Sequence, residues 1–278
     1  MGARGGFGRI VPPNARCGYR ALRGPIRHAE RRSVGVVRAI PVLSLPVSLS
    51  LPLATPAAPR AGAGALVTHA GGESVVLYAG RALAWPREKT LFVADVHLGK
   101  AATFRAGGVP LPRGSTATDL ARLDALLADS DAARLVVLGD FLHARAGRVP
   151  ALARTFVAWR ARHPRLDVVL VRGNHDAHAG DPPPEWVVDC VDEPHAFAPF
   201  LACHRVAAPR SGYALCGHVH PAIRVQGSDD SARLPCFVLG TKRAILPAFG
   251  RFTGLAEIAP DPGDRIVAIA GRALFELP

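Results

Sequence analysis

The sequence has few cysteines and no arrangement of them that would build a covalent or zinc scaffold. None of them forms a CxxC pair, and the five positions are odd in number and scattered: Cys17, Cys190, Cys203, Cys216 and Cys236. This excludes a disulfide framework and a zinc ribbon. It favours a reducing compartment, so we expect a cytoplasmic location.

The chain also lacks a long, uninterrupted apolar run. Its most apolar stretch, residues 40–57, is broken by Pro41, Pro46 and Pro52. A membrane-spanning helix needs about 20 predominantly apolar residues, and proline interrupts helices. We therefore expect no membrane association. The arginine pair at residues 31–32 is compatible with a twin-arginine export signal, but the many prolines that follow make this the less favoured reading.

Acidic residues are nearly absent from the first 62 positions. These positions hold ten of the 34 basic residues but only one of the 22 acidic ones, Glu30. Residues 63–278 thus carry a net charge of only +3, although the whole chain carries +12, and the charge supports nucleic-acid binding by the folded part only weakly. Residues 1–62 are expected to be a disordered tail, unless the true start lies further along, for example at Val67.

Residues 63–278 show the alternation of strands and helices that is typical of an α/β domain. Apolar runs predict strands at residues 74–80, 90–96, 133–140 and 166–174. Helical spacing of apolar residues predicts helices at 115–130, with a capping box of Thr116 and Asp119, and at 150–164. Strand patterns dominate the last third, at residues 213–219, 234–240, 252–259 and 265–271.

Two pairs of polar residues follow apolar runs with a spacing of two. Asp95 and His97 form one pair, and His218 and His220 form the other. In an extended chain, residues i and i+2 point to the same side, so each pair could face one metal ion. A single DxH pair often arises by chance, and two histidines can lie on a strand edge without metal. Each pair alone leaves both readings open.

Two more strand ends carry groups of the same kind. Asp140 ends one predicted strand, and Asn174 with His175 end the next, each group directly after a glycine. Strand ends that meet at one edge build sites in open α/β sheets. Carboxylate, amide and imidazole donors suit Mn²⁺, Fe²⁺ or Zn²⁺, and the absence of thiolates argues against structural zinc. No GxSxG or P-loop motif is present, which favours direct attack by water over a covalent intermediate.

The motif order DxH, GD, GNHD and GHxH over residues 90–222 resembles the calcineurin-like metallophosphoesterase superfamily. This resemblance implies a four-layer α/β/β/α sandwich of two mixed sheets, with two divalent metal ions at the strand ends. It implies that one ion is held by Asp95, His97 and His220 and the other by Asn174, His204 and His218, with Asp140 as the bridge. Asp140 and His175 are the implied catalytic residues, and His175 would donate a proton to the phosphate or polarise it.

The resemblance also implies a histidine ligand between the GNHD and GHxH motifs. His204 fits this role, but Arg205 follows it where the family usually has glycine or proline. His195 is the alternative, and His204 could instead be a satisfied structural histidine.

Flanking segments resemble the bacterial DNA-ligase-associated metallophosphoesterases more closely; they are residues 81–114, 138–144 and 246–254. This resemblance implies a manganese-dependent phosphodiesterase or endonuclease in DNA repair, with a DNA ligase, nuclease or helicase as partner. Lys100, Arg105 and His143 are weaker candidates for substrate contacts. The alternatives are a phosphatase or pyrophosphatase on a nucleotide or other small phosphoester, and a metal-bound scaffold without activity.

Overall fold

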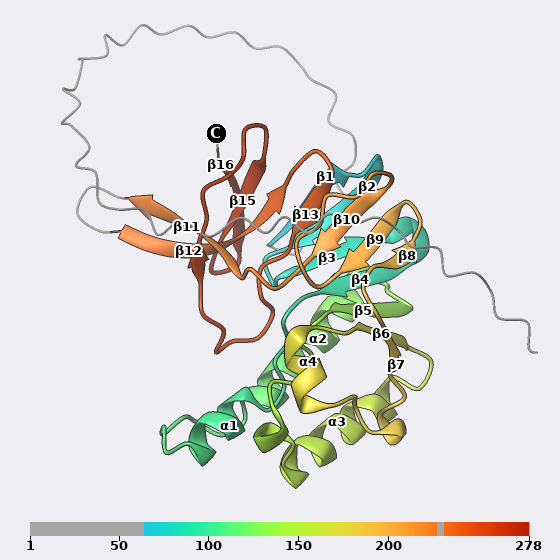
Figure 1. Cartoon of the computed structure of the whole chain (residues 1–278), viewed down its shortest axis with the longest axis vertical. Helices are drawn as coiled ribbons and strands as arrows, with labels where there is room; N and C mark the ends of the chain where they lie inside the picture. Colours follow the sequence, from blue (N-terminus) through green and yellow to red (C-terminus); the bar gives the residue numbers. More distant parts are fainter. Residues whose placement is uncertain (1–63, 227–230, 278) are drawn as a thin grey trace, which may run out of the picture.

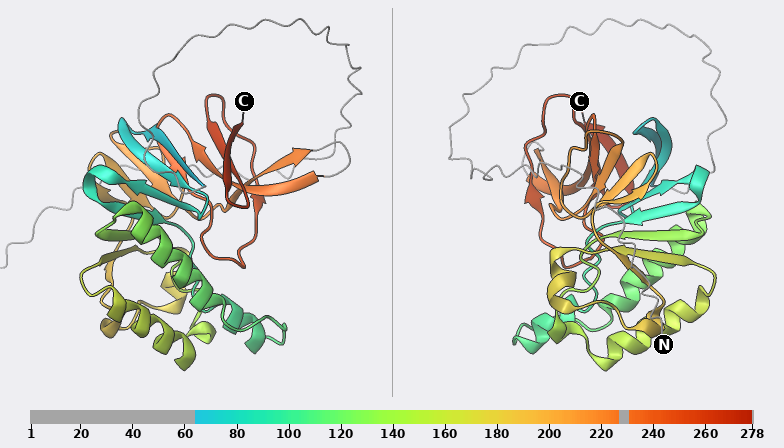
Figure 2. Two further views of the ribbon diagram at one scale, coloured as in Figure 1. Left: turned by 180° about the vertical axis from the view of Figure 1, so that it is seen from behind. Right: turned by 45° about the vertical axis from the view of Figure 1, so that its right-hand side comes forward.

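A computed structural model describes residues 64–226 and 231–277 of the protein (Figure 1). The expected disordered tail and the export-signal alternative lie outside the described residues. The assignment of residues 63–278 to one phosphoesterase domain stays a prediction. Two β-sheets pack face to face, and the α-helices lie on one side of them (Figures 1 and 2).

The first sheet has seven strands that neighbour one another in chain order. They are β1 (Ala65–Ala70), β2 (Glu73–Tyr78), β3 (Ala82–Trp85), β4 (Thr90–Val93), β5 (Arg134–Leu138), β6 (Asp167–Val171) and β7 (Asp189–Val191). Strands β1 to β4 pair antiparallel, and β4 to β7 pair parallel. The carboxyl ends of β4, β5 and β6 therefore meet at one edge of the sheet.

The second sheet is mixed and has nine strands, of which β9, β10 and β13 are mutually parallel. They are β8 (His195–Phe197), β9 (Phe200–Cys203), β10 (Tyr213–Cys216), β11 (Pro221–Gln226), β12 (Ser231–Leu239), β13 (Arg243–Ile245), β14 (Ala256–Glu257), β15 (Arg265–Ala270) and β16 (Ala273–Leu277). Between the two sheets lies a core that includes Phe92, Leu138, Phe200 and Phe237, all fully buried.

The helices belong to the connections of the first sheet. They are α1 (Lys100–Ala106), α2 (Ser115–Ser130), α3 (Pro150–Arg162) and α4 (Asn174–Ala179), with short 3₁₀ turns η1 (Pro86–Glu88), η2 (Arg145–Gly147) and η3 (Pro184–Trp186). Buried leucines of α2 and the aromatic residues Phe156 and Trp159 of α3 pack on the outer face of this sheet. None of the helices in the described ranges is long and apolar enough to cross a membrane.

The expected two mixed sheets are confirmed, with one difference in the layers. Within residues 195–226 and 231–277 the structure contains strands and loops but no helix, so the described part of the chain places no helical layer on the second sheet. The outer face of that sheet is instead lined by apolar residues such as Val238 and Ile266, with Val206, Val219 and Ile258 from the neighbouring loops and Ile223 packed on them. The observed order of layers is helices, first sheet, second sheet.

Several sequence predictions are confirmed at the level of single elements. Helix α2 occupies the predicted residues 115–130, and Pro150 begins α3. The predicted capping box of Thr116 and Asp119 is wrong: Gly114 is the N-cap, and no side chain caps α2. The predicted strand 252–259 shrinks to the two residues of β14, which pair with β11 in the second sheet.

Candidate metal centre

The candidate ligands gather at one edge of the two-sheet sandwich. Each follows the end of a strand: Asp95 and His97 after β4, Asp140 after β5, Asn174 after β6, His204 after β9, and His218 and His220 after β10. Three groups have all their ligand atoms within 4.8 Å of one another. Two consist of candidate ligands, namely Asp95, His97 and His220, and Asp140, His204 and His218; the third joins His97 to His143 and His175. Asn174 Oδ1 lies 2.9 Å from His204 Nε2, so the structure brings together all seven candidate ligands.

The first group contains two buried polar atoms without a partner. Asp95 Oδ1 lies 3.4 Å from His220 Nε2, and neither atom has a hydrogen-bond partner in the structure. The other carboxylate oxygen of Asp95 accepts the backbone N–H of His218 at 2.9 Å. Buried polar atoms are costly unless they are paired, and a divalent cation between them would satisfy both.

The second group centres on His204, which is fully buried. Its Nδ1 lies 3.1 Å from the Leu138 carbonyl oxygen, so this nitrogen carries the proton and donates it. The lone pair of Nε2 then faces Asn174 Oδ1 at 2.9 Å, His218 Nδ1 at 3.0 Å and Asp140 Oδ1 at 3.5 Å. The Asn174 and Asp140 oxygens and the Nε2 atom are all electron-pair donors, and such a convergence fits a bound cation.

Asp140 lies between the two groups. One carboxylate oxygen is 3.5 Å from His204 Nε2, and the other is 3.8 Å from His97 Nε2. The backbone N–H of His175 donates to the first oxygen at 2.9 Å, which fixes the carboxylate's orientation. Burial raises the pKa of Asp140. Its position between the groups is the one that a bridging ligand requires.

Five candidate ligands have a left-handed backbone: Asp95, His97, Asp140, His218 and His220, with φ of 53°, 50°, 52°, 70° and 54°. The strands end before these residues, so the two pairs converge through tight turns. The extended-chain argument for their i and i+2 spacing was therefore wrong, although the residues do meet. Non-glycine residues rarely adopt this conformation, and such strain clusters at functional sites.

Glycines before the ligands allow the strand ends to come this close. A Cβ atom on Gly139 would lie 2.1 Å from the Nδ1 of His204, and one on Gly173 would lie 2.3 Å from Asp140 Oδ1. Any side chain at either position would displace a ligand. The sequence interpretation of these glycines as sites of close approach is confirmed.

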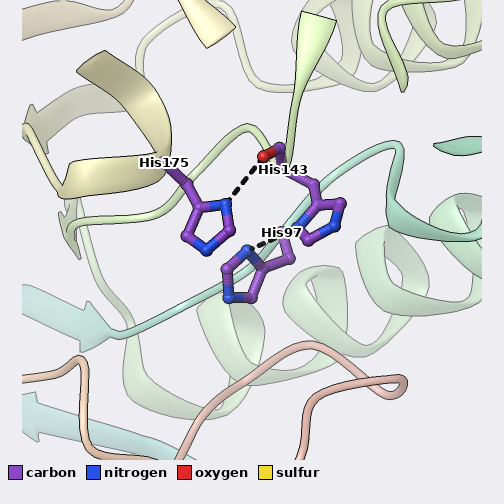
Figure 3. Close-up of side chains that lie close together, drawn as sticks. All are labelled: His97, His143 and His175. Carbon is purple, nitrogen blue, oxygen red and sulfur yellow. Dashed lines mark hydrogen bonds between the residues drawn. The ribbon is translucent and has the colours of Figure 1, made fainter. Parts of the chain in front are cut away.

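His175 and His143 lie beside the ligand cluster (Figure 3). Their rings stack with centroids 4.9 Å apart, and His143 Nδ1 is 3.3 Å from His97 Nδ1. His175 Nδ1 donates to the His143 carbonyl oxygen at 2.8 Å. Its Nε2 therefore faces the cluster, 4.0 Å from an oxygen of Asp140.

Three imidazoles at the centre, those of His97, His143 and His218, favour the neutral form. Burial, together with the nearby charge of Lys100, lowers the pKa of His97 to about 2. Burial likewise lowers the pKa of His143 to about 4 and also lowers that of His218. Neutral imidazole is the form that binds metal ions, so these rings need not lose a proton near pH 7.

The two other candidates for substrate contacts, Lys100 and Arg105, differ in their surroundings. Lys100 is the first residue of α1 and lies beside His97. The backbone N–H of Lys100 donates to the His97 carbonyl oxygen at 3.1 Å. The Arg105 guanidinium instead donates to the carbonyl oxygens of Leu111 and Pro112, which commits it to the loop after α1.

His204, rather than His195, lies at the centre. His195 is in strand β8 at the edge of the second sheet, where its ring contacts Phe197. The unusual Arg205 has a local explanation: Glu193 accepts the backbone N–H groups of His204 and Arg205 at 2.7 and 2.8 Å, and the Arg205 guanidinium lies 3.1 Å from the same carboxylate. This ion pair holds the end of β9, so His204 keeps its place without glycine or proline.

Asp176 was not among the predicted site residues, but it positions two loops that carry candidate ligands. This buried carboxylate accepts the backbone N–H groups of Leu142 and Gly173 at 2.9 Å each and that of Phe141 at 3.3 Å. It thereby ties the loop after Asp140 to the loop before Asn174. The available signal was its place in the GNHD motif, but only the fold shows what it contacts.

These features define a metal-dependent phosphoester hydrolase, and comparisons with known proteins agree. The calcineurin-like phosphoesterase profile matches residues 88–230. The crystal structure of the Pseudomonas putida nuclease MPE is similar, with 43% sequence identity and a TM-score of 0.68, covering 77% of this chain and all of that one. A structure of the Escherichia coli phosphoesterase Yfce is 16% identical over 68% of this chain and 97% of its own, with a TM-score of only 0.31. No curated protein sequence matches the chain significantly.

The chain belongs to the calcineurin-like phosphoesterase family. This family uses divalent metal ions, and the donor set described above fits them, since orphaned carboxylate and imidazole atoms face one another in two groups.

Proposed function

We propose that the protein is a phosphodiesterase with two metal ions that cleaves nucleic acid. The observation that carries this proposal is the pair of ligand groups that share Asp140 at the junction of the two sheets. Similarity to a bacterial nuclease at 43% identity supports a nucleic-acid substrate over a small phosphomonoester.

The residues would divide the work as follows. Asp95, His97 and His220 would hold one ion, and Asn174, His204 and His218 the other, with Asp140 shared. When bound, the two ions would activate a water molecule and stabilise the charge that develops on the phosphoryl oxygens.

His175 would act on the substrate rather than hold metal. Its Nδ1–H is committed to the His143 carbonyl oxygen, which leaves Nε2 free to exchange a proton with the phosphoester or its leaving oxygen. The backbone N–H of His175 donates a hydrogen bond to Asp140, the carboxylate that lies between the two ligand groups. This bond would help to position the His175 imidazole beside the ions.

The ion and the cellular setting are part of the proposal. We favour Mn²⁺, the ion that the resemblance to ligase-associated metallophosphoesterases implies; the donor set of carboxylate and amide oxygens with imidazoles accepts it, and would also accept Fe²⁺ or Zn²⁺. We further propose a cytoplasmic role in bacterial DNA repair beside a DNA ligase, nuclease or helicase; the four described cysteines, which are all free, are in keeping with a reducing compartment.

The test compares a chromogenic phosphodiester with the matching monoester, using the purified protein in Mn²⁺ and in EDTA. We expect cleavage that requires Mn²⁺ and favours the diester, followed by cleavage of DNA oligonucleotides. A preference for the monoester would assign the protein to the phosphatases instead. Binding of Mn²⁺ without any turnover would support the scaffold alternative.

A further inference from the structure

Helix α1 presents two side chains beside the metal centre that the proposed reaction leaves unused. Lys100 and Phe104 are four residues apart, so they lie on the same face of the helix. The residue that precedes this helix, Gly99, is only two positions after the candidate ligand His97.

Lys100 lies beside the ligand cluster, because its backbone N–H donates to the carbonyl oxygen of His97 at 3.1 Å. Within the described ranges, no hydrogen bond or ion pair engages the ammonium group. The Lys100 ammonium group thus has no committed hydrogen-bond partner, whereas the Arg105 guanidinium is engaged by two backbone carbonyl oxygens.

Phe104 lies on the same face of α1 as Lys100 and is exposed at the protein surface. Its side chain is 37% exposed, unusual for phenylalanine, yet its ring centroid lies 6.0 Å from that of His143. The His143 ring in turn stacks on His175. A row of three rings therefore leads from the protein surface to the candidate catalytic histidine.

The helix is held firmly against the centre. Gly99 and Gly147 pack backbone to backbone, so that a Cβ atom on Gly99 would lie 2.5 Å from the Gly147 carbonyl oxygen. At the other end, the Phe104 carbonyl oxygen accepts the backbone N–H of Val109 at 2.9 Å.

We propose that α1 recognises one nucleotide next to the cleaved phosphate, with Lys100 on a phosphate oxygen and Phe104 stacked on the base. A cation and an exposed aromatic ring side by side match the two parts of a nucleotide, since backbone phosphates attract lysine and every base has a face that stacks. This inference rests on the proposed phosphodiesterase function and names the groups that would favour nucleic acid over simple esters.

Two chromogenic diesters with the same leaving group test the role of Phe104. Thymidine 5′-(p-nitrophenyl) phosphate carries a nucleoside, and methyl p-nitrophenyl phosphate carries only a methyl group. Stacking on a base contributes enough that Phe104→Ala should lower the ratio of the two kcat/KM values about 10- to 100-fold. Phe104→Trp should preserve the ratio.

Phe275 provides the matched control, because it is 49% exposed but lies in β16 of the second sheet. Phe275→Ala should leave both kcat/KM values unchanged. A ratio that stays at the wild-type value in Phe104→Ala, with an unchanged Tm, would overturn the stacking role. Failure of the wild-type protein to cleave either diester in Mn²⁺ would instead contradict the proposed function itself.

The Lys100 role has a separate readout, because both diesters carry the phosphate. Lys100→Met should lower kcat/KM for both by a similar factor, and Lys100→Arg should restore most of it. Added salt should weaken DNA binding by the wild-type protein more steeply than binding by Lys100→Met, since one phosphate contact is lost. Identical salt dependence in the two proteins would overturn this role.

Discussion

The two sheets contribute different chemistry to the same centre. The first sheet supplies the candidate oxygen ligands, namely the carboxylates of Asp95 and Asp140 and the amide of Asn174, together with His97. The second sheet supplies imidazoles alone, from His204, His218 and His220. Each ligand group contains members of both sheets, so neither sheet holds a complete ion site. Assembly of the sandwich is therefore also assembly of the centre.

The largest effects are expected when one candidate ligand is removed from each sheet in turn. Asp140 approaches both groups, whereas His218 belongs to one. Asp140→Asn should abolish Mn²⁺-dependent turnover. His218→Ala should retain activity at high Mn²⁺ but raise the Mn²⁺ concentration for half-maximal rate by at least about 10-fold, since even indirect ligand partners contribute that much. Manganese titrations of the initial rate measure both effects, and equal losses in the two variants would contradict the shared role of Asp140.

His175 comes from the first sheet's side of the centre but is not expected to bind metal. His175→Ala should lower kcat by about 10²- to 10⁴-fold, the usual contribution of a general acid or base. Its side chain is 39% exposed, so the Tm should change little. His69→Ala, an exposed histidine in β1, is the control and should keep full activity. A large fall in Mn²⁺ affinity in His175→Ala would mean that His175 is a ligand.

Metal binding should stabilise the contact between the sheets, because each ion site spans both. Ligand at 100 times its Kd adds about 2.7 kcal/mol of stability. For a domain of this size, that corresponds to a rise in Tm of roughly 5–10 °C. Thermal unfolding with Mn²⁺ and with EDTA measures the shift, and His220→Ala should reduce it. An equal Tm in Mn²⁺ and EDTA would show that the ions do not join the sheets.

The smallest expected effect concerns pH in the metal-free protein. The pKa values of His97, His143 and His218 are lowered on folding, so the unfolded chain binds more protons below its ordinary histidine pKa of about 6.5. Stability should therefore fall as the pH drops from 7 to 5. Unfolding in EDTA at the two pH values measures this loss, which should be smaller in His97→Gln. A Tm that rises on acidification would contradict the neutral state of these histidines.

Much of the centre was predictable because strand ends and glycines leave local signals. Apolar runs marked β5 and β6, and the polar residues that follow them, Asp140 and Asn174, lie in the candidate metal centre. The short helices α1 and α4 were not predicted, because segments of seven and six residues show too little periodicity. The backbone at the ligands was predicted wrongly, since left-handed turns at aspartate and histidine have no sequence signature of their own.

The kinds of candidate ligand, their order and the strands that deliver them could be read from the chain, because residue chemistry and local periodicity are properties of the sequence. Packing between distant segments settles which histidine completes the second group. His204 rather than His195 reaches Asn174 because β9 pairs beside β10 and the two sheets pack through a shared apolar core. Tertiary packing also brings Asp176 into contact with two loops and places Phe104 of α1 beside His143. These contacts join residues that lie far apart in the chain or depend on packing between elements, and local propensities do not encode them.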